Sequence, residues 1–399
     1  MITERLAALA DVPAPLVVVD LAAFDANTAE LLRRAAGRPV RLATKSVRVP
    51  ALIERAVAAG FTGLMAYSLR EALWWAARGI DDVLVGYPTA DRGALAELVG
   101  DAPARARVTL MVDDVAHLDL LDHARAASGA PDAVVRVCVD VDASLRVGPG
   151  ALGGRQPHLG VRRSPVRTPA DAAGLAREAT SRGYDVRGVM FYEAQVAGLP
   201  DSSAAVRVVK RASLAELASR RGAVVAAVSD AVGHPLDLVN GGGTGSLART
   251  AQDPAVTELT AGSGLAAPTL FDHYRLPPGG RRLRPAVLFG LDVVRRPAPG
   301  IVTVFSGGYL ASGPPGASRA PTPVLPPGLR LTRAEGAGEV QTPLHGPAAD
   351  RLAVGDRVWF RHAKAGEIME RFADVVLLGP ADGARQVVPT YRGAGLAFG

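Results

Sequence analysis

Lysine and cysteine are both scarce in this sequence. Of 45 basic residues only Lys45, Lys210 and Lys364 are lysines, and Cys138 is the single cysteine. One cysteine cannot form an intrachain disulfide, and its place in the apolar run VVRVCVDV favours a core residue over a nucleophile. Because arginine supplies nearly all of the positive charge, each lysine is a candidate for chemistry that arginine cannot perform.

Two other features are missing. No apolar run is long enough to span a membrane and nothing resembles a signal peptide, so we expect a cytosolic protein that does not bind membranes. The net charge of +6 and the pI near 9.8 would permit nucleic-acid binding, but the arginines are scattered among acidic residues. A nucleic-acid-binding module is therefore the least favoured function, and dispersed surface charge explains the excess.

The first two thirds of the chain alternate short apolar runs with helical periodicity. Segments 50–60, 70–79 and 171–183 have the helical pattern, and each ends at a glycine. This alternation predicts an α/β fold, a (β/α)8 TIM-type barrel over residues 13–275, although an open doubly wound sheet has the same local pattern. The eight expected strands are 40–44, 63–68, 82–87, 107–112, 133–141, 186–192, 236–241 and 256–262.

From residue 276 the helical pattern largely disappears and proline and glycine become frequent. Strands are expected within 285–294, 300–308 and 355–362, which predicts a C-terminal all-β domain over 276–399. The proline-rich segment 312–328 is expected to be a long loop between strands. Residues 1–12 either pack on this domain or precede the barrel.

Lys45 ends the first expected barrel strand, in RLATKSVRVP. A lysine amine can be deprotonated and condense with a carbonyl, which a guanidinium cannot do. The alternative is an ordinary charged residue at a strand end. In a parallel barrel the active site lies at the carboxyl ends of the strands, so position as well as chemistry makes Lys45 a candidate for an imine-forming residue.

Two glycine-rich turns follow the last two expected barrel strands. NGGGTGS (240–246) follows the seventh and AGSGL (261–265) the eighth. Glycines let backbone N–H groups approach an anion, although a tight turn explains either segment alone. A phosphate cradle and an imine-forming lysine are what pyridoxal 5'-phosphate (PLP) requires. The candidate cofactor-binding residues in these turns are Gly242, Gly243, Thr244, Gly245, Gly262 and Ser263.

Several motifs together resemble a known family. They are DLAAFDAN (20–27), the lysine at the first strand end, GGGTGS, GGYLASG (307–313), EGAGEVQTPL (335–344), RHAKAGEIMERF (361–372) and TYRGAG (390–395). In them the chain resembles the alanine racemase-like, fold-type III PLP enzymes, and most of all the D-threonine aldolase and D-serine dehydratase group, with its amino acid deaminase/aldolase homologues. The resemblance implies that Lys45 binds PLP.

The resemblance also implies three residues near the cofactor. Arg146, beyond the fifth strand, matches a family arginine, although it is otherwise a surface charge. Tyr192 matches the tyrosine of the family's Tyr-x-Gly-His motif, or is a core aromatic. Gln195 replaces the histidine of that motif, and an amide cannot move protons as an imidazole does.

A second departure concerns metal. Aldolases and dehydratases of this group hold a divalent ion near a C-terminal His-x-Asp or His-x-Cys pair, whereas here His362 is followed by Lys364. An ammonium is a poor ligand but could take the electrostatic place of the ion. We therefore expect no catalytic metal at this pair, although ligands distant in sequence could assemble another site.

The resemblance implies a homodimeric PLP-dependent lyase for a small β-hydroxy amino acid, most often of D configuration, acting by retro-aldol cleavage or by dehydration and deamination. One alternative is an amino acid racemase, with Lys45 on one face of the substrate and Tyr309 on the other. Another is a PLP carrier without turnover, which the additional β-domain disfavours.

Overall fold

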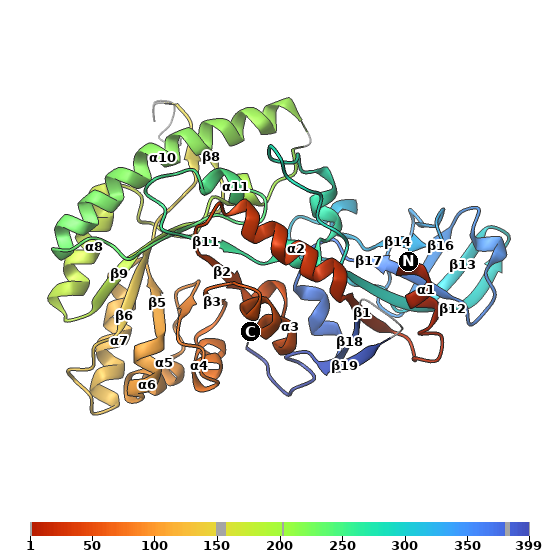
Figure 1. The fold of residues 1–399 in the computed structure, drawn as a ribbon, viewed down its shortest axis with the longest axis horizontal. Coiled ribbons are helices and arrows are strands. Elements are labelled where there is room, and N and C mark those ends of the chain that lie inside the picture. Colours follow the sequence, from red (N-terminus) through yellow and green to blue (C-terminus); the bar gives the residue numbers. More distant parts are fainter. Residues whose placement is uncertain (1, 149–156, 202, 380–383, 399) are drawn as a thin grey trace. The chain divides into compact units, whose positions relative to one another are not determined.

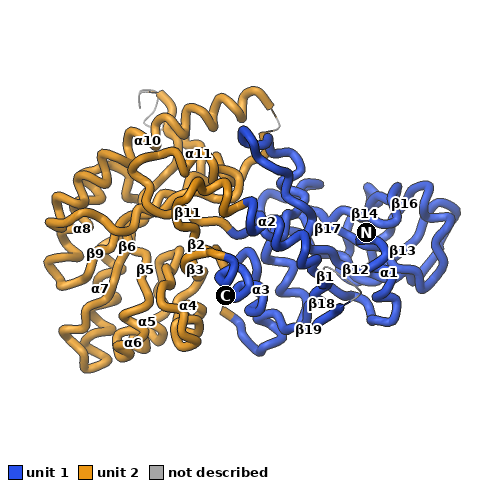
Figure 2. The backbone as a smooth tube through the Cα atoms, viewed as in Figure 1, with its two compact units in different colours: residues 1–30, 45–59, 262–397 blue, residues 31–44, 60–261, 398–399 orange. Residues whose placement is uncertain are grey.

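The computed structural model describes residues 2–148, 157–201, 203–379 and 384–398. They form two compact units, drawn in two colours in Figure 2. Unit 1 comprises residues 1–30, 45–59 and 262–397, and unit 2 comprises 31–44, 60–261 and 398–399. Within the described residues, no helix combines the length and the apolar character that crossing a membrane requires.

Unit 2 contains a closed barrel of eight parallel strands in the order β10-β11-β2-β3-β4-β5-β6-β9. The predicted barrel is thereby confirmed, and the open sheet is not formed. Each predicted strand corresponds to one barrel strand. The strands are β2 (Val40–Ala43), β3 (Gly63–Ala66), β4 (Val83–Val85), β5 (Val108–Val112), β6 (Arg136–Asp140), β9 (Asp185–Phe191), β10 (Leu238–Gly241) and β11 (Glu258–Ala261).

Two helices of unit 2 illustrate how the sequence marks a helix start. The Ser68 side chain accepts a hydrogen bond from the Glu71 amide at the start of α4 (Leu69–Ala77), and Thr168 and Asp171 form a capping box at α8 (Pro169–Ser181). The longest described helix, α10 (Ala204–Val232), lies beside α8 in Figure 1. Other helices here are α5 (Arg92–Gly100), α6 (Ala102–Arg107), α7 (Val115–Ala127), α9 (Ala194–Ala197) and α11 (Leu247–Thr250).

The barrel interior is filled by side chains. One buried apolar cluster is formed by Leu84, Met111, Cys138, Met190 and Leu238. This places Cys138 in the core, as predicted, and burial raises the pKa of its thiol.

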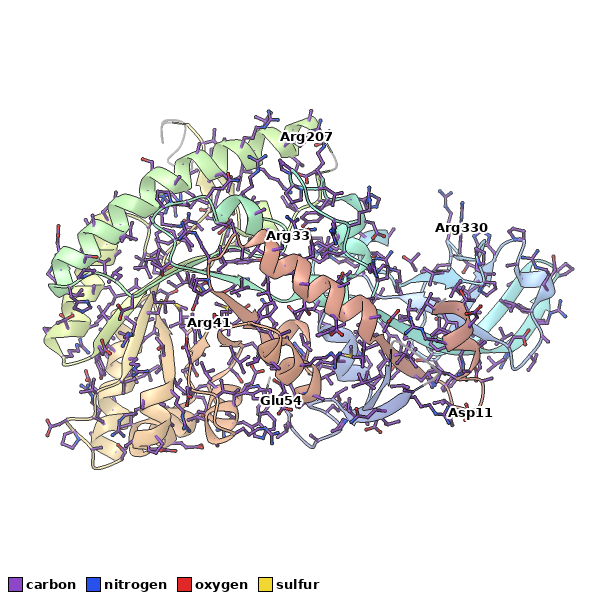
Figure 3. All side chains as sticks on the ribbon, in the orientation of Figure 1. Asp11, Arg33, Arg41, Glu54, Arg207 and Arg330 are labelled. Atoms are coloured by element: carbon purple, nitrogen blue, oxygen red, sulfur yellow. The ribbon has the colours of Figure 1, made fainter. Side chains whose placement is uncertain are left out.

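A buried charge also lies within this unit. Arg41, labelled in Figure 3, is 2% exposed and pairs with Glu258 at 2.7 Å and Asp82 at 2.6 Å. Asn240 Nδ2 donates to the same Glu258 at 2.6 Å. A buried guanidinium surrounded by acceptors satisfies its hydrogen bonds without water.

Unit 1 contains a nine-stranded sheet. Its strand β1 (Leu16–Asp20) pairs antiparallel with β12 and parallel with β18, and all five of its residues are buried. The range 13–275 assigned to the barrel from sequence thus includes a strand of this sheet, because an apolar five-residue run does not show which sheet it joins. The other strands are β12 (Val287–Ala298), β13 (Ile301–Phe305), β14 (Thr322–Leu325), β15 (Arg330–Leu331), β16 (Gln341–His345), β17 (Arg357–Arg361), β18 (Asp374–Leu378) and β19 (Arg385–Pro389).

Two segments of this unit, residues 1–12 and 312–328, had no strand or helix assigned from sequence. Leu6 and Leu9, from α1 (Ile2–Ala7) and the turn after it, pack in one apolar cluster with Leu288 and Trp359. The expectation of a long loop over 312–328 is wrong in part, because β14 lies within it and pairs with β17. Pro323 is tolerated there because β14 has a single described partner strand.

Candidate cofactor and substrate site

Lys45 lies in a short 3-10 turn (Thr44–Ser46) directly after β2, and it is half-buried. Three residues of unit 1 hold this turn. Arg48 Nε donates to the Lys45 carbonyl at 3.2 Å, and Arg48 pairs with Glu370 at 2.6 Å. A Cβ built on Gly366, whose φ is +96°, would overlap the Lys45 carbonyl oxygen. The backbone of Lys45 is therefore fixed by contacts with a segment more than 300 residues away in the chain.

Ser46 connects the lysine turn with the second predicted glycine-rich turn. Its Oγ lies 3.1 Å from Ser263 Oγ, and both residues belong to unit 1. Ser263 begins the short helix α12 (Ser263–Ala266), and Gly262 directly follows β11. The structure thus brings Ser263 next to the residue that follows Lys45.

The other two lysines have different surroundings. Lys210 on α10 is 7% exposed and forms an ion pair with Asp201 at 3.0 Å. Lys364 Nζ donates to Ser312 Oγ at 2.9 Å. The three lysines of this chain therefore occupy three distinct environments, and of them only Lys45 lies in a turn that directly follows a barrel strand.

The glycine-rich turn after β10 is held by Glu193, which is completely buried. Its carboxylate accepts from the Gly242 amide at 3.2 Å, from Ser246 Oγ at 2.9 Å and from Thr250 Oγ1. The Gly243 amide donates to Ser246 Oγ at 3.1 Å. These bonds fix the turn from inside, so the amides of Gly242 and Gly243 are used by the protein itself.

A buried arginine, Arg221, lies near the Glu193 carboxylate. Arg221 Nη2 lies 3.8 Å from Glu193, and Arg221 also pairs with Asp253. The cation compensates two acids that are both largely excluded from water.

Tyr192 packs on the same turn. A Cβ added at Gly243 would lie 3.3 Å from Tyr192 Cε2 and 2.8 Å from the Ala197 Cβ, so no larger residue fits at Gly243 without a shift. The Arg163 guanidinium lies 5.4 Å from the ring centroids of both Tyr192 and Tyr87. The predicted residues Tyr192 and Gly243 are thus neighbours, together with an arginine that the sequence interpretation missed.

Asp140 ends barrel strand β6 and is 7% exposed. Burial, assisted by the negative charge of Asp113, raises the pKa of Asp140 to about 7, although Arg163 opposes the shift. Burial also raises the pKa of Asp113, which lies 3.4 Å from His117. A carboxyl group that exchanges a proton near neutral pH thus lies in the same unit as Tyr192.

Gln195 and Arg146 have protein partners of their own. Gln195 Nε2 donates to the Ala143 carbonyl at 2.6 Å, and its buried Oε1 has no hydrogen-bond partner among the described residues. Arg146 is paired with Asp142 at 3.0 Å, and 37% of its side chain is exposed. Asp142 also accepts from Arg167 and Ser144.

Tyr309 belongs to an aromatic cluster in unit 1. Its ring packs edge-on against Phe289 and Phe372 with centroids 5.1 Å and 5.5 Å away. Its hydroxyl lies 2.9 Å from Ser306 Oγ, and burial raises its pKa. A raised pKa makes the phenol a weaker proton donor.

His362 and Lys364 line one cavity in unit 1 together with Tyr309. His362 is 2% exposed, and neither ring nitrogen has a partner among the described residues. Burial, together with the positive charge of Arg361, lowers the pKa of His362 to about 3, so the imidazole is neutral at pH 7. Three predicted catalytic residues therefore meet at one cavity.

Across the described part of the chain, no three His, Cys, Asp or Glu side chains gather in an arrangement that could hold a metal ion. That the pair His362 and Lys364 binds no metal stays a prediction.

The fold is that of the alanine racemase-like proteins, and no family model matches the sequence. A D-threonine aldolase from Filomicrobium marinum superposes with a TM-score of 0.77 at 24% identity, covering 96% of both chains. The D-threo-3-hydroxyaspartate dehydratase from Delftia sp. HT23 has a TM-score of 0.70 at 20% identity, covering 96% of this chain and 98% of that one.

In sequence, the chain is similar to a D-threonine aldolase from an Arthrobacter species. The two are 31% identical over 261 residues, which is 64% of this chain and 61% of that protein. The match thus spans about three fifths of the relative's length. These similarities confirm the predicted fold class and the predicted resemblance.

Sequence interpretation missed Glu193, Arg163 and Asp140. Glu193 follows Tyr192 directly, and acidic residues just after strands are usually solvated, so its burial was not visible. Asp140 ends an apolar strand at the predicted active-site end of the barrel, which is a signal that could have identified it.

Proposed function

We propose that this protein is a PLP-dependent lyase that acts on a small β-hydroxy amino acid, with the D configuration favoured. The observation that carries the proposal is the position of Lys45, directly after a barrel strand and fixed by Gly366 and Arg48. The sequence similarity to a D-threonine aldolase supports the reaction class.

The residues present fit the cofactor. PLP needs a lysine for its aldehyde and a polar cradle for its phosphate. Lys45 would hold the aldehyde carbon, while Thr244, Ser46 and Ser263 carry hydroxyls in or beside the small-residue turns. Because β2 and β10 are parallel strands of one barrel, the residues that follow them emerge at the same end. When bound, PLP withdraws electrons from the bonds at the substrate Cα.

Residues of the chain itself would position the glycine-rich turn and move protons at the substrate. Glu193 holds the glycine-rich turn in one conformation, and Tyr192 packs against Gly243. The Lys45 amine would take or return a proton at the substrate. The neutral His362 ring offers one N–H donor and one lone pair.

Two lyase reactions remain open. In retro-aldol cleavage the β-hydroxyl loses its proton and the Cα–Cβ bond breaks, giving glycine and an aldehyde. In dehydration the Cα proton and the hydroxide leave, and hydrolysis then gives a keto acid and ammonia. A panel of D- and L-β-hydroxy amino acids, with aldehyde, keto acid and chirality followed separately, distinguishes the two. Turnover that changes only chirality would contradict the lyase assignment and favour a racemase.

A racemase is less well supported because burial raises the pKa of Tyr309, whose ring packs edge-on against Phe289 and Phe372. A PLP carrier is less well supported because the additional β-domain contains a cavity lined by His362 and Lys364.

We also propose that the active protein is a homodimer. Exposed apolar side chains on the β-domain support this proposal, with Phe305, Leu310 and Val340 each 45% to 58% exposed. Light scattering at assay concentration tests it, and full activity at monomer mass would contradict it. The cytosolic location stays a prediction.

A further inference from the structure

Unit 1 contains a cavity of about 430 Å³. Its walls are residues 309–312, residues 362–364, 367, 368, 370 and 371, and Arg392. We call it the β-domain cavity. Among the described residues that line it are both halves of the pair that departs from the related lyases, His362 and Lys364.

The lining of the β-domain cavity carries an excess of positive charge. Lys364, Arg371 and Arg392 line it, against the two acids Glu367 and Glu370. Glu370 is already paired with Arg48 at 2.6 Å. A concave surface with surplus cations favours an anionic ligand.

The polar groups are arranged around Ser312. Lys364 Nζ donates to Ser312 Oγ at 2.9 Å, and the Ser312 amide donates to Glu367 Oε2 at 2.6 Å. Glu367 is thus used to hold the backbone of the cavity wall. An ammonium has three N–H donors, so Lys364 can keep the serine contact and still donate to a carboxylate.

His362 adds a second kind of recognition. Its ring is 2% exposed, and both nitrogens are unpartnered among the described residues. Buried donors and acceptors are normally paired, so an unpaired ring at a cavity wall points to a ligand group that completes it. A neutral imidazole presents one donor and one acceptor, which is the complement of a hydroxyl group.

The chain segment that forms part of the cavity wall also contacts Lys45 and Arg48. Gly366 packs against the Lys45 carbonyl, and Glu370 pairs with Arg48, three residues after Lys45. The segment that carries His362 and Lys364 therefore also determines where the Lys45 backbone lies.

We propose that the β-domain cavity binds the substrate side chain, with Lys364 donating to a carboxylate and His362 pairing with a hydroxyl. The preferred substrate is then a β-hydroxy amino acid whose side chain ends in a carboxylate, rather than in a methyl group. This inference rests on the proposed lyase function.

The first test measures binding without turnover. Isothermal titration calorimetry of the PLP-loaded protein uses malate, a hydroxy dicarboxylate without an amine. Lys364→Ala should weaken malate binding by about 10- to 100-fold, the range for losing one charge-assisted hydrogen bond, and Lys364→Arg should recover part of it. Arg330→Ala is the matched control, because Arg330 is an exposed cation of the same unit outside the cavity lining (labelled in Figure 3). Equal malate affinity in the wild type and Lys364→Ala would overturn the proposal.

The second test compares kcat/KM for 3-hydroxyaspartate and for threonine, both of D configuration. Lys364→Ala should reduce the ratio of the two values by about 10-fold or more, with cofactor absorbance unchanged. Two outcomes would mean that the cavity binds an anion other than the substrate side chain. One is an equal loss of kcat/KM for both substrates in Lys364→Ala. The other is malate binding by a protein whose kcat/KM shows no preference for 3-hydroxyaspartate. If wild type turns over neither amino acid while malate binding still depends on Lys364, the lyase function fails and the anion site stands.

Discussion

The backbone of Gly366 packs directly against the carbonyl oxygen of Lys45. A Cβ at Gly366 would overlap that oxygen, and the φ of +96° is one that residues with a side chain rarely adopt. The lysine that would carry the cofactor is thus positioned by a glycine of the C-terminal β-domain. This contact suggests a direct test of how the β-domain supports the site.

Gly366→Ala should destabilise the protein by about 3 kcal/mol or more, because backbone strain and a steric overlap add together. Gly355 provides a matched control, since its φ of +97° is nearly the same and a Cβ there meets nothing within 4 Å. Gly355→Ala should therefore cost only the strain, about 1–2 kcal/mol. Urea unfolding measures both variants, and equal losses would show that the contact with Lys45 does not matter.

PLP should be attached to Lys45. Purified protein is expected to show visible absorbance that borohydride reduction removes, and peptide mass mapping should find the reduced cofactor on Lys45. Lys45→Ala should abolish the attachment, whereas Lys210→Ala should leave it intact because Lys210 is paired with Asp201. Mapping of the cofactor to Lys210 or Lys364 would contradict the assigned site.

Glu193→Gln should loosen the glycine-rich turn. The carboxylate accepts from Gly242, Ser246 and Thr250, and an amide nitrogen at one of its positions cannot accept. We expect a loss of about 2–4 kcal/mol in unfolding free energy and weaker PLP binding, measured by dialysis and absorbance. Glu178→Gln is the control, because Glu178 forms an exposed pair with Arg182 that is worth about 0.5 kcal/mol. Unchanged PLP affinity in Glu193→Gln would contradict this role.

Asp140 should make stability fall as pH rises. Its folded pKa of about 7 lies above the ordinary value of 3.8, so folding favours the protonated carboxyl. That contribution is complete below pH 4 and is lost as pH rises to about 7, at roughly 1.4 kcal/mol for each unit of pKa shift. Unfolding of wild type and Asp140→Asn should therefore diverge across this window, with the variant relatively more stable at pH 8. For Asp91→Asn the trend should be the reverse: the wild type should gain stability relative to this variant as pH rises, because the Ala94 amide lowers the pKa of Asp91. Parallel curves for wild type and Asp140→Asn would disprove the assignment.

Activity should survive exhaustive chelation. A protonated Lys364 cannot coordinate a divalent ion, and a cation placed beside it would be repelled. Turnover should be the same before and after EDTA treatment and dialysis. Loss of activity that manganese or zinc restores would show that a metal binds through other ligands.

The eight strands of the barrel were predictable from the sequence. Parallel strands that are covered on both sides appear as continuous apolar runs, and eight such runs alternating with helices correspond to the eight observed strands. Lys45 was a candidate from sequence because imine chemistry requires an amine and because strand ends carry function in this fold. Strand β1 was not assignable, because its apolar residues suit either sheet.

What the sequence by itself determined about this protein is its fold class, the candidate lysine and the departures at Gln195 and Lys364, since these depend on local pattern and residue chemistry. Tertiary structure decided which residues meet. Gly366 against Lys45, Glu193 under the glycine-rich turn, and His362 with Lys364 and Tyr309 at one cavity are contacts between segments distant in the chain. Burial also decided the protonation of Asp140 and His362, because the cost of removing a charge from water depends on neighbours that no local pattern reveals.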